Sequence, residues 1–430
     1  MDKKLIKNAG WLIAVKIVQA LLSIAVSIIS ARYLGPSNFG LVSYAASLVS
    51  FVTPIALLGL GNIQVQEYIQ NKDDEGKILG SSVIMSLGSA TLCIAGIVAF
   101  SAIANLNEIE ATVVVALYSI ALFFEATELI VYWFQAKYLN KYYAVVGLIA
   151  YIAVSTYKIL LLVYGASIYL FAIASAIDYF LISIVLFLIY KKKGGQKLIF
   201  DKEVAKRLFH KAKYYIIPNL MVAIFTQTDH IMLKHMIDNS ATGYYQAAVY
   251  CAGYANFVFT ALADVCRPRI FENQKESEEA FELSVVKLNT LIIYLGVLLG
   301  VAMSIGAPLV IKILYTDAYS NSIDPLRIVA WFPLFSYIGV SRNIWLLAKD
   351  KQKHLWIANV SGAVINVGLN FLLIPVLGIS GAAIASLFTQ FATNVLFTVI
   401  FPPYRRFFVL TVKGFNLSYL FRKTSNEKTN

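Results

Sequence analysis

The stretch SIYLFAIASAIDYFLISIVLFLIY (167–190), followed directly by KKKGGQKLIFDKEVAKRLFHKAK (191–213), decides the fold. The first part is long and apolar, with Asp178 as its only charged residue. About 20 such residues in a helix are enough to cross the hydrocarbon core of a bilayer. The second part carries nine Lys or Arg residues and cannot enter that core. The sequence therefore predicts a membrane-spanning helix that ends at a basic loop.

The composition extends this prediction to the whole chain. Of its 430 residues, 59% are hydrophobic and 14% are charged, and the mean hydropathy is +0.70. A soluble protein carries about 25% charged residues, so a water-soluble globule is excluded. The net charge of +12 would suggest a nucleic-acid partner in a soluble protein. In a membrane protein the same excess can set the orientation, so its meaning depends on where the charges lie.

Stretches similar to 167–190 recur along the chain. We expect a spanning helix wherever about 20 mostly apolar residues are bounded by charge. Twelve segments meet this description, which predicts an all-α integral membrane protein. They are residues 10–31, 39–61, 79–104, 111–135, 142–164, 167–190, 214–237, 244–264, 284–312, 325–347, 355–375 and 380–401.

The loops between these segments differ sharply in charge. With twelve spans, alternate loops fall on opposite sides of the membrane. One set, which includes both termini, holds 28 Lys or Arg, whereas the other set holds only Arg32. Because basic loops stay in the cytoplasm, both termini are predicted to be cytoplasmic. Most of the net charge is thus explained by topology, and we expect no nucleic-acid partner.

The two halves of the chain resemble each other. WFQAKYLNK (133–141) matches WLLAKDKQK (345–353), and GASIYLFAIASA (165–176) matches GISGAAIASL (378–387) with a short gap. Six predicted spans separate each copy from its partner, so the copies have the same orientation, as in parallel repeats. We therefore predict two six-helix lobes around a central cleft. The predicted parts are 1–190, a basic linker at 191–213, 214–401, and a basic tail at 402–430.

The linker itself allows two interpretations. From Asp201 to Lys213, the apolar residues Val204, Leu208 and Phe209 are spaced among cations. This pattern fits an amphipathic helix that lies along the bilayer surface. A solvated charged linker is the alternative.

Polar residues within the spans are the candidates for function, because a charge at membrane depth is costly and needs a partner, water or a role. On the first span, Lys16 and Gln19 begin a polar stripe along one helical face. The seventh span carries Asn219, Gln227, His230 and Lys234 on a similar stripe. We interpret the stripes as two walls of a wet cleft. Packing of helices through small polar residues is the structural alternative.

The acidic residues Glu125, Glu128 and Asp229 also lie within predicted spans. Glu125 and Glu128 share a helical face. They either pair with Lys158 or bind an ion that drives transport. Asp229 is a further candidate for binding such an ion. His230 and His235 lack further His or Cys residues at ligand spacing, so no metal site is predicted. Nucleotide-binding and catalytic motifs are also missing, so we expect neither a cofactor nor enzymatic activity.

Three segments resemble a known family. They are ISARYLGPSNFG (29–40), DHIMLKHMIDNSATGYYQAA (229–248) and WLLAKDKQKHLWIANVSGAVINVGLNFLLIPVLGISGAAIAS (345–386). They are similar to bacterial polysaccharide flippases, the O-antigen and capsule repeat-unit translocases of the multidrug/oligosaccharidyl-lipid/polysaccharide exporter superfamily. The resemblance extends over essentially all of 1–401. It identifies the superfamily better than the substrate.

The resemblance implies a protein of the bacterial inner membrane that moves an undecaprenyl-diphosphate-linked oligosaccharide from the cytoplasmic to the outer leaflet. It implies the bilayer and other proteins of polysaccharide or lipopolysaccharide assembly as partners. Cations in the cleft would neutralise the diphosphate. Two alternatives stay open, namely a drug or metabolite antiporter of the same superfamily and a membrane polysaccharide polymerase or ligase. The candidate contacts for the head group are Lys16, Gln19, Arg32, Lys158, Asn219, Gln227, His230 and Lys234.

Overall fold

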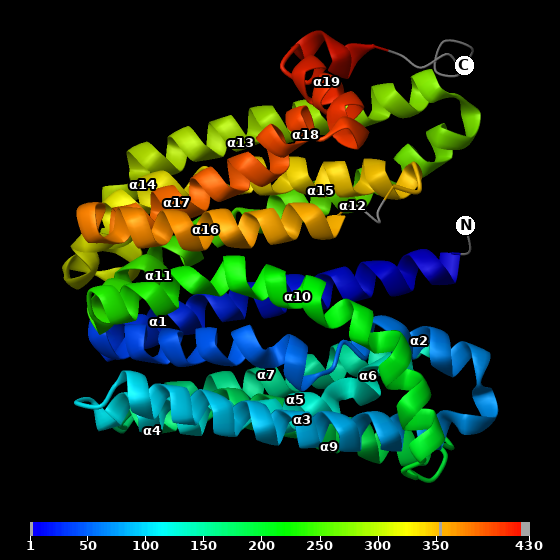
Figure 1. Cartoon of the computed structure of the whole chain (residues 1–430), viewed down its shortest axis with the longest axis vertical. Helices are drawn as coiled ribbons and strands as arrows, with labels where there is room; N and C mark the ends of the chain where they lie inside the picture. The colour runs from blue at the N-terminus through cyan, green and yellow to red at the C-terminus, as the bar shows by residue number, and fades with distance from the viewer. Residues whose placement is uncertain (1–2, 352–354, 423–430) are drawn as a thin grey trace. The chain divides into compact units, whose positions relative to one another are not determined.

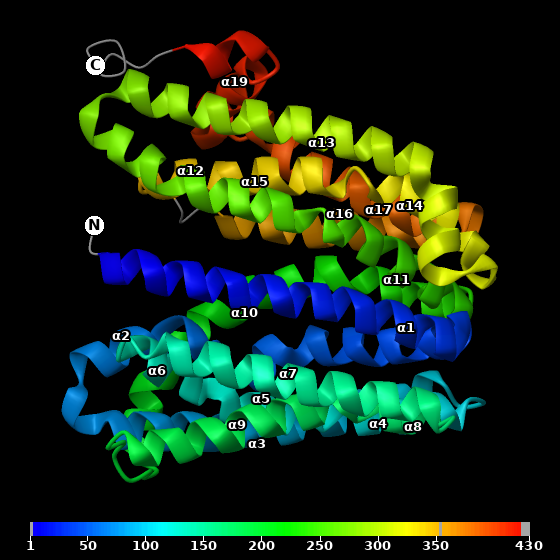
Figure 2. The ribbon, with the colours of Figure 1, turned by 180° about the vertical axis from the view of Figure 1, so that it is seen from behind.

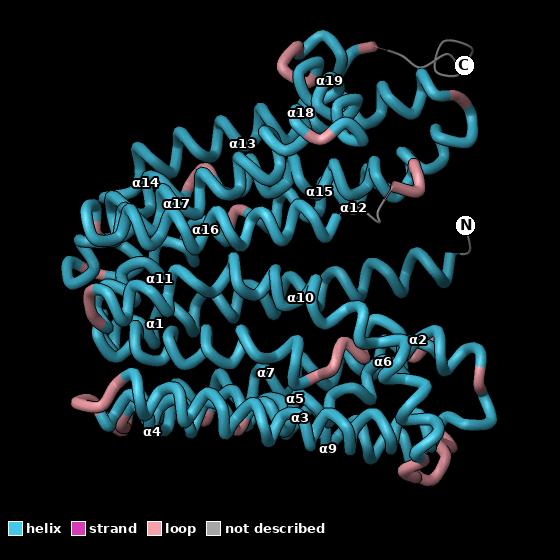
Figure 3. Tube along the Cα trace, in the orientation of Figure 1, coloured by secondary structure: helices cyan, strands magenta, loops and turns pink. Residues whose placement is uncertain are grey.

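The computed structural model describes residues 3–351 and 355–422, with side chains described from residue 18 and from residue 356 onward in the two ranges. All regular secondary structure in these ranges is helical (Figure 3). Ten helical stretches there are long and apolar enough to cross a membrane. The protein is therefore an all-α, multi-pass membrane protein, as predicted.

The ten stretches account for eleven of the twelve predicted spans. The first of them, Val18–Gln70, contains two predicted spans, because helix α1 (Lys3–Ala56) runs through a reversal at Gly35. Gly35 adopts φ 70°, a conformation that suits a residue without Cβ, and Pro36 follows it. The seventh predicted span is α10 (Lys202–Met236), whose cations and polar residues keep it out of the ten. The spans were thus predicted correctly.

The chain divides into two compact units, Met1–Gln227 and Thr228–Asn430, and the boundary falls within α10 (Figure 1). In the first unit two of the membrane passes, Ile109–Ala136 and Ile168–Lys192, each consist of several shorter helices. Besides α1, its helices are α2 (Gly61–Gln70), α3 (Glu75–Ala104), α4 (Ile109–Ser119), α5 (Ala121–Thr127), α6 (Val131–Ala136), α7 (Asn140–Val163), α8 (Ile168–Ala172), α9 (Ala174–Lys192) and the first part of α10.

The second unit repeats this order of passes. Its final pass contains a π-helical turn at Ala392–Leu396, and its last helix follows the final pass and packs against α13 (Figure 2). After the end of α10, its helices are α11 (Asn239–Tyr254), α12 (Asn256–Glu276), α13 (Glu278–Tyr315), α14 (Ile323–Val329), α15 (Phe332–Ala348), α16 (Leu355–Leu377), α17 (Ile379–Phe391), α18 (Phe397–Ile400) and α19 (Arg405–Lys413).

An ion pair recurs at matching places in the two units. Glu75, in the first turn of α3, lies 2.5 Å from Lys137 Nζ, and Trp133 Nε1 donates to the same carboxylate over 2.7 Å. In the second unit Glu278, in the first turn of α13, pairs with Lys349. Trp133 and Lys137 belong to the first copy of the repeated motif, and Lys349 belongs to the second. The sequence repeat is therefore also a repeat of contacts.

The segment between the two halves packs on the first unit. Ile199 N–H donates to Gly76 O over 3.3 Å, and Gln196 Oε1 accepts from Gly76 N–H over 2.9 Å. Val204 and Leu208 are buried in the core of that unit, whereas Phe209 is exposed. The apolar face of this amphipathic helix is thus covered by protein at Val204 and Leu208.

Glu67 on α2 fastens the same segment electrostatically. Its carboxylate is almost fully buried and lies 2.5 Å from Lys211 Nζ and 3.4 Å from Arg207 Nε. A buried carboxylate needs such partners, because burying an isolated charge costs several kcal/mol. The attraction between the paired charges offsets about that cost. Two of the cations of the basic linker, Arg207 and Lys211, therefore hold it to the first unit.

Candidate functional site

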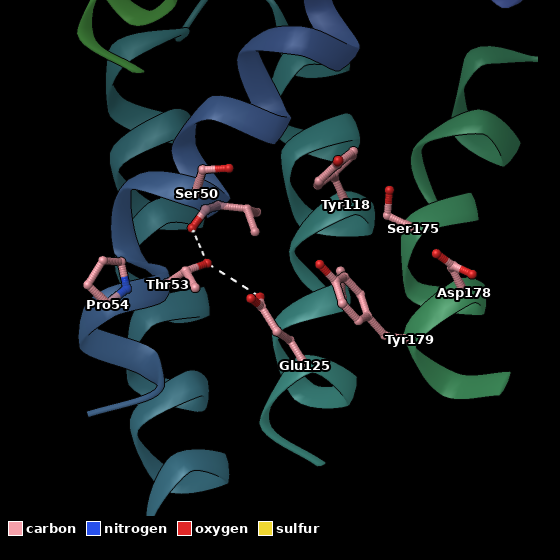
Figure 4. Close-up of a pocket in the computed structure, with 10 residues that line it drawn as sticks. Ser50, Thr53, Pro54, Tyr118, Glu125, Ser175, Asp178 and Tyr179 are labelled. Atoms are coloured by element: carbon pink, nitrogen blue, oxygen red, sulfur yellow. Dashed lines mark hydrogen bonds between the residues drawn. The ribbon is translucent and has the colours of Figure 1, made fainter. Parts of the chain in front are cut away.

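A pocket of about 310 Å³ lies among α1, α4, α5 and α9 within the first unit (Figure 4). Two acidic side chains, Glu125 and Asp178, face it together with hydroxyl groups and two tyrosine rings. An ionisable pocket at membrane depth is a candidate for function by default. Its lining is Val49, Ser50, Thr53, Pro54, Tyr118, Ala121, Glu125, Ser175, Asp178 and Tyr179.

The carboxylates of this pocket have few strong partners. Thr53 Oγ1 lies 3.4 Å from Glu125 Oε2, while the same hydroxyl also donates to Val49 O over 3.0 Å. Asp178 Oδ1 is buried without a hydrogen bond. The charge of Asp178 interacts with that of Lys158 on α7, but no ion pair within 4 Å joins Lys158 to an acid in the described ranges. Such weakly compensated carboxylates can accept a proton or attract a cation.

The second unit holds a carboxylate in a closed cage. Asp229 on α10 is only 3% exposed. Its Oδ1 accepts from Asn366 Nδ2 over 3.1 Å and from Asn370 Nδ2 over 2.6 Å. Its Oδ2 accepts from the hydroxyls of Tyr245 and Ser386. The donors come from α11, α16 and α17, so the cage joins four helices of one unit.

All four donors to Asp229 are neutral groups. Hydrogen bonds stabilise a buried carboxylate, but no cationic side chain forms an ion pair with this one in the described ranges. The site therefore combines an ionisable group with four neutral hydrogen-bond donors.

His230 lies beside this cage. Its ring stands edge-on to that of Tyr245, with 5.1 Å between centroids. Both ring nitrogens are buried and neither makes a hydrogen bond of normal geometry, although the Gln246 side chain is near. His230 thus adds a second titratable group to the neighbourhood of Asp229.

The predicted site residues are distributed over both units. Of the eight candidate head-group contacts, six belong to the first unit and two, His230 and Lys234, to the second. The side chain of Lys16 lies outside the described residues. Gln19 lies against α7, where its Nε2 would be 3.4 Å from a Cβ at Gly147. Arg32 is exposed, Lys158, Asn219 and Gln227 are partly exposed, and Lys234 is buried.

The structure adds residues that sequence reasoning missed. The partners of Asp229, namely Tyr245, Asn366, Asn370 and Ser386, were not among the candidates. Asn366 and Asn370 carried a signal, because two amides at i and i+4 share one face of an otherwise apolar span. No group of three or more His, Cys, Asp or Glu side chains in the described ranges is placed to hold a metal ion.

Comparison with known proteins identifies the family. Residues 5–274 match the sequence profile described as "Polysaccharide biosynthesis protein". The chain belongs to this family. A curated relative, an uncharacterised membrane protein of Methanocaldococcus jannaschii, is 26% identical over 243 residues, which are 52% of this chain and 47% of the relative. The match thus spans about half the length of that relative.

Solved structures share the fold over nearly the whole chain. A lipid II flippase, MurJ, superposes with a TM-score of 0.69 at 16% identity, covering 97% of this chain and 94% of the other. A multidrug resistance MATE transporter of the MOP superfamily gives 0.61 at 15% identity, with 96% of each chain covered. The eukaryotic MATE transporter AtDTX14 gives 0.57 at 14% identity, with 95% and 96% covered. At these identities the likeness concerns the fold.

Proposed function

We propose that this member of the polysaccharide biosynthesis family is a flippase. It carries polyprenyl-diphosphate-linked oligosaccharide repeat units from the cytoplasmic to the outer leaflet of the inner membrane by alternating access. The family match and the flippase-like fold support transport of a lipid-linked saccharide. The observation that carries the proposal furthest is the Asp229 cage, an ionisable group inside the membrane-spanning region that has only neutral donors.

In this proposal Asp229 couples transport to an ion. Binding of a proton or a sodium ion would compensate the buried carboxylate, and its release would leave the cage under-compensated, which links ion occupancy to the packing of α10, α11, α16 and α17. Glu125 and Glu128 of the first unit are the second candidates for coupling. Glu125 lines the pocket of the first unit, and neither Glu125 nor Glu128 has a cation within ion-pair distance in the described ranges.

The eight predicted cationic and amide residues bind the head group in the same proposal. A diphosphate requires positive charge to leave water, and lysine or arginine side chains supply it. Lys158→Ala with Lys234→Ala is expected to abolish surface polysaccharide while the protein still accumulates in the membrane. Lys312→Ala is the matched control, because Lys312 is well exposed beside Asp317. Normal polysaccharide display in the double variant would reject the cationic site.

The deciding experiment asks on which leaflet the lipid-linked saccharide accumulates. We expect it on the cytoplasmic leaflet in a strain that lacks the gene, and on the outer leaflet once the wild-type gene is restored. Asp229→Asn should fail to restore export, whereas Asp264→Asn, which changes a carboxylate that is 61% exposed, should succeed. Equal outer-leaflet exposure with and without the gene would eliminate the flippase function.

A drug or metabolite antiporter is the second candidate, and the pocket of the first unit favours it. Two carboxylates beside the rings of Tyr118 and Tyr179 suit an organic cation. This function predicts that overexpression lowers the accumulation of a cationic dye and that Glu125→Gln abolishes the effect. Unchanged dye accumulation on overexpression would reject the antiporter function and leave the flippase as the remaining proposal.

A further inference from the structure

The last described segment, residues 402–422, combines exposed apolar residues with cations. It contains Arg405, Arg406, Lys413 and Arg422 and no acidic residue. It also exposes five large apolar side chains to the surroundings. These are Val409, Val412, Phe415, Leu417 and Phe421. Phe415 is 63% and Phe421 80% exposed, which is unusual for aromatic residues that face water.

One face of this segment is fixed to α13. Phe407 and Leu410 are completely buried. Arg406 forms two hydrogen bonds of 2.5 Å with the carboxylate of Glu282, and Tyr294 OH donates to Phe415 O over 2.9 Å. The five apolar side chains therefore stay exposed in a segment that is fixed to α13.

The contacts on α13 give the depth of this surface. Lys287 is the last charged residue of α13 before an uncharged stretch at 288–311, which is long enough to cross the hydrocarbon core. Gly414 packs at Asn289 and Thr290, and the backbone oxygen of Phe415 accepts a hydrogen bond from Tyr294 OH. At about 1.5 Å per residue, Asn289 and Thr290 lie about 3–5 Å beyond Lys287 into that stretch. Phe415 thus lies level with the edge of the apolar core.

The surface also continues the lipid-facing side of α13. Tyr294 and Leu298, one helical turn further on, are exposed apolar residues of a membrane-spanning helix. The tail meets this strip at Phe415, whose backbone oxygen accepts a hydrogen bond from Tyr294 OH, although the two residues are far apart in sequence. This side of the tail therefore borders an exposed apolar strip of a membrane-spanning helix.

We propose that residues 405–422 form a membrane-interface anchor that binds anionic phospholipids. Its exposed apolar side chains enter the edge of the acyl layer, and Arg405, Lys413 and Arg422 contact lipid phosphates. Arg406 is paired with Glu282. Arg405, Lys413 and Arg422 form no ion pair within 4 Å in the described ranges, although Lys413 and Arg422 line a pocket that also contains Glu279 and Glu282. Each cation near an anionic surface strengthens binding by roughly fivefold. This inference is independent of the transported substrate.

The test uses the full-length chain, with Cys93, Cys251 and Cys266 replaced by Ala. Spin labels are placed through Phe415→Cys and Phe421→Cys, and through Glu276→Cys at the exposed last residue of α12 as the control. The protein is reconstituted in vesicles of phosphatidylcholine mixed with phosphatidylglycerol. Collision rates are measured with oxygen, which concentrates in lipid, and with a water-soluble nickel chelate.

We expect an oxygen-to-nickel ratio severalfold higher at 415 and 421 than at 276. Equal ratios at the three positions would overturn the anchor. The ratio at 421 should fall in pure phosphatidylcholine and in R405Q/K413Q/R422Q, but not in K197Q/K202Q/K206Q, which removes three exposed cations from the other unit. An unchanged ratio in the first two cases would overturn the role of anionic lipid. If the cysteine-free chain is not monodisperse, F415W, F421W and E276W in the native chain, read by quenching with brominated lipid, make the same comparison.

Discussion

Asn370 Nδ2 lies 2.6 Å from Asp229 Oδ1, although 141 residues separate the two in sequence. Asn366 approaches the same oxygen from one turn earlier on α16, so a single helix face supplies two donors to one carboxylate oxygen. The arrangement brings α16 against α10 through polar groups in the apolar interior of the second unit. Packing of α16 against α10 therefore includes hydrogen bonds to Asp229.

Asn370→Ala tests this relationship directly. The substitution leaves a buried carboxylate with one donor fewer, and we expect it to lower the free energy of unfolding by about 1–3 kcal/mol. The measurement is denaturant-induced unfolding in detergent. In the Asp229→Asn background the same substitution should cost much less, because the charge that needs the donor is gone. Equal costs in the two backgrounds would mean that Asn370 stabilises the unit by packing alone.

The two tryptophans of the repeated motif should respond differently to the same change. Trp133 Nε1 donates to Glu75, whereas Trp345 Nε1 is buried without a hydrogen-bond partner in the described ranges. Trp133→Phe should therefore destabilise the protein by about 1.5–3 kcal/mol more than Trp345→Phe, the value of a hydrogen bond to a charged group. Thermal unfolding of the two purified variants provides the comparison, and equal losses would contradict it.

Two glycines of α3 offer a matched test of the linker contact. A Cβ at Gly80 would lie 2.5 Å from Ile199 O, whereas a Cβ at Gly88 would meet nothing within 4 Å. Gly80→Ala should displace the linker and cost about 1–3 kcal/mol. Gly88→Ala should be neutral or stabilising by up to about 1 kcal/mol, because alanine favours the helix. Faster hydrogen exchange at 196–201 in Gly80→Ala, but not in Gly88→Ala, would locate the effect.

The N-terminus of α10 should carry a pH-dependent contribution to stability. Hydrogen bonds from the backbone N–H groups of Val204 and Glu203 lower the pKa of Asp201. A lowered native pKa gives stability that is complete above the unfolded pKa of about 4 and is lost as the pH falls through the native value. Wild type should therefore exceed Asp201→Ala in melting temperature near neutral pH, and the difference should shrink below about pH 4. A difference that is constant with pH would exclude the carboxylate as its source.

The charged residues of the candidate sites were predictable from the sequence, whereas their uncharged partners were not. Asp229, Glu125 and Glu128 were identified from the sequence, because a charge within an apolar span is conspicuous by itself. Asn366, Asn370 and Ser386 were missed, since polar but uncharged residues are common in spans and their meaning depends on which carboxylate they reach. The reversal at Gly35 was predicted as a loop between two spans. The positive φ of Gly35 is seen only in the structure.

The sequence by itself determined the membrane class, the twelve passes and the repeated order of helices. Each of these depends on the length of a local apolar run, the bilayer being a solvent that selects such runs one at a time. Only the tertiary structure decided that Val204 and Leu208 are covered by protein, that Glu67 holds Lys211, and that four donors surround Asp229. These contacts join residues up to 157 positions apart, and no local pattern encodes the packing that brings them within hydrogen-bond distance.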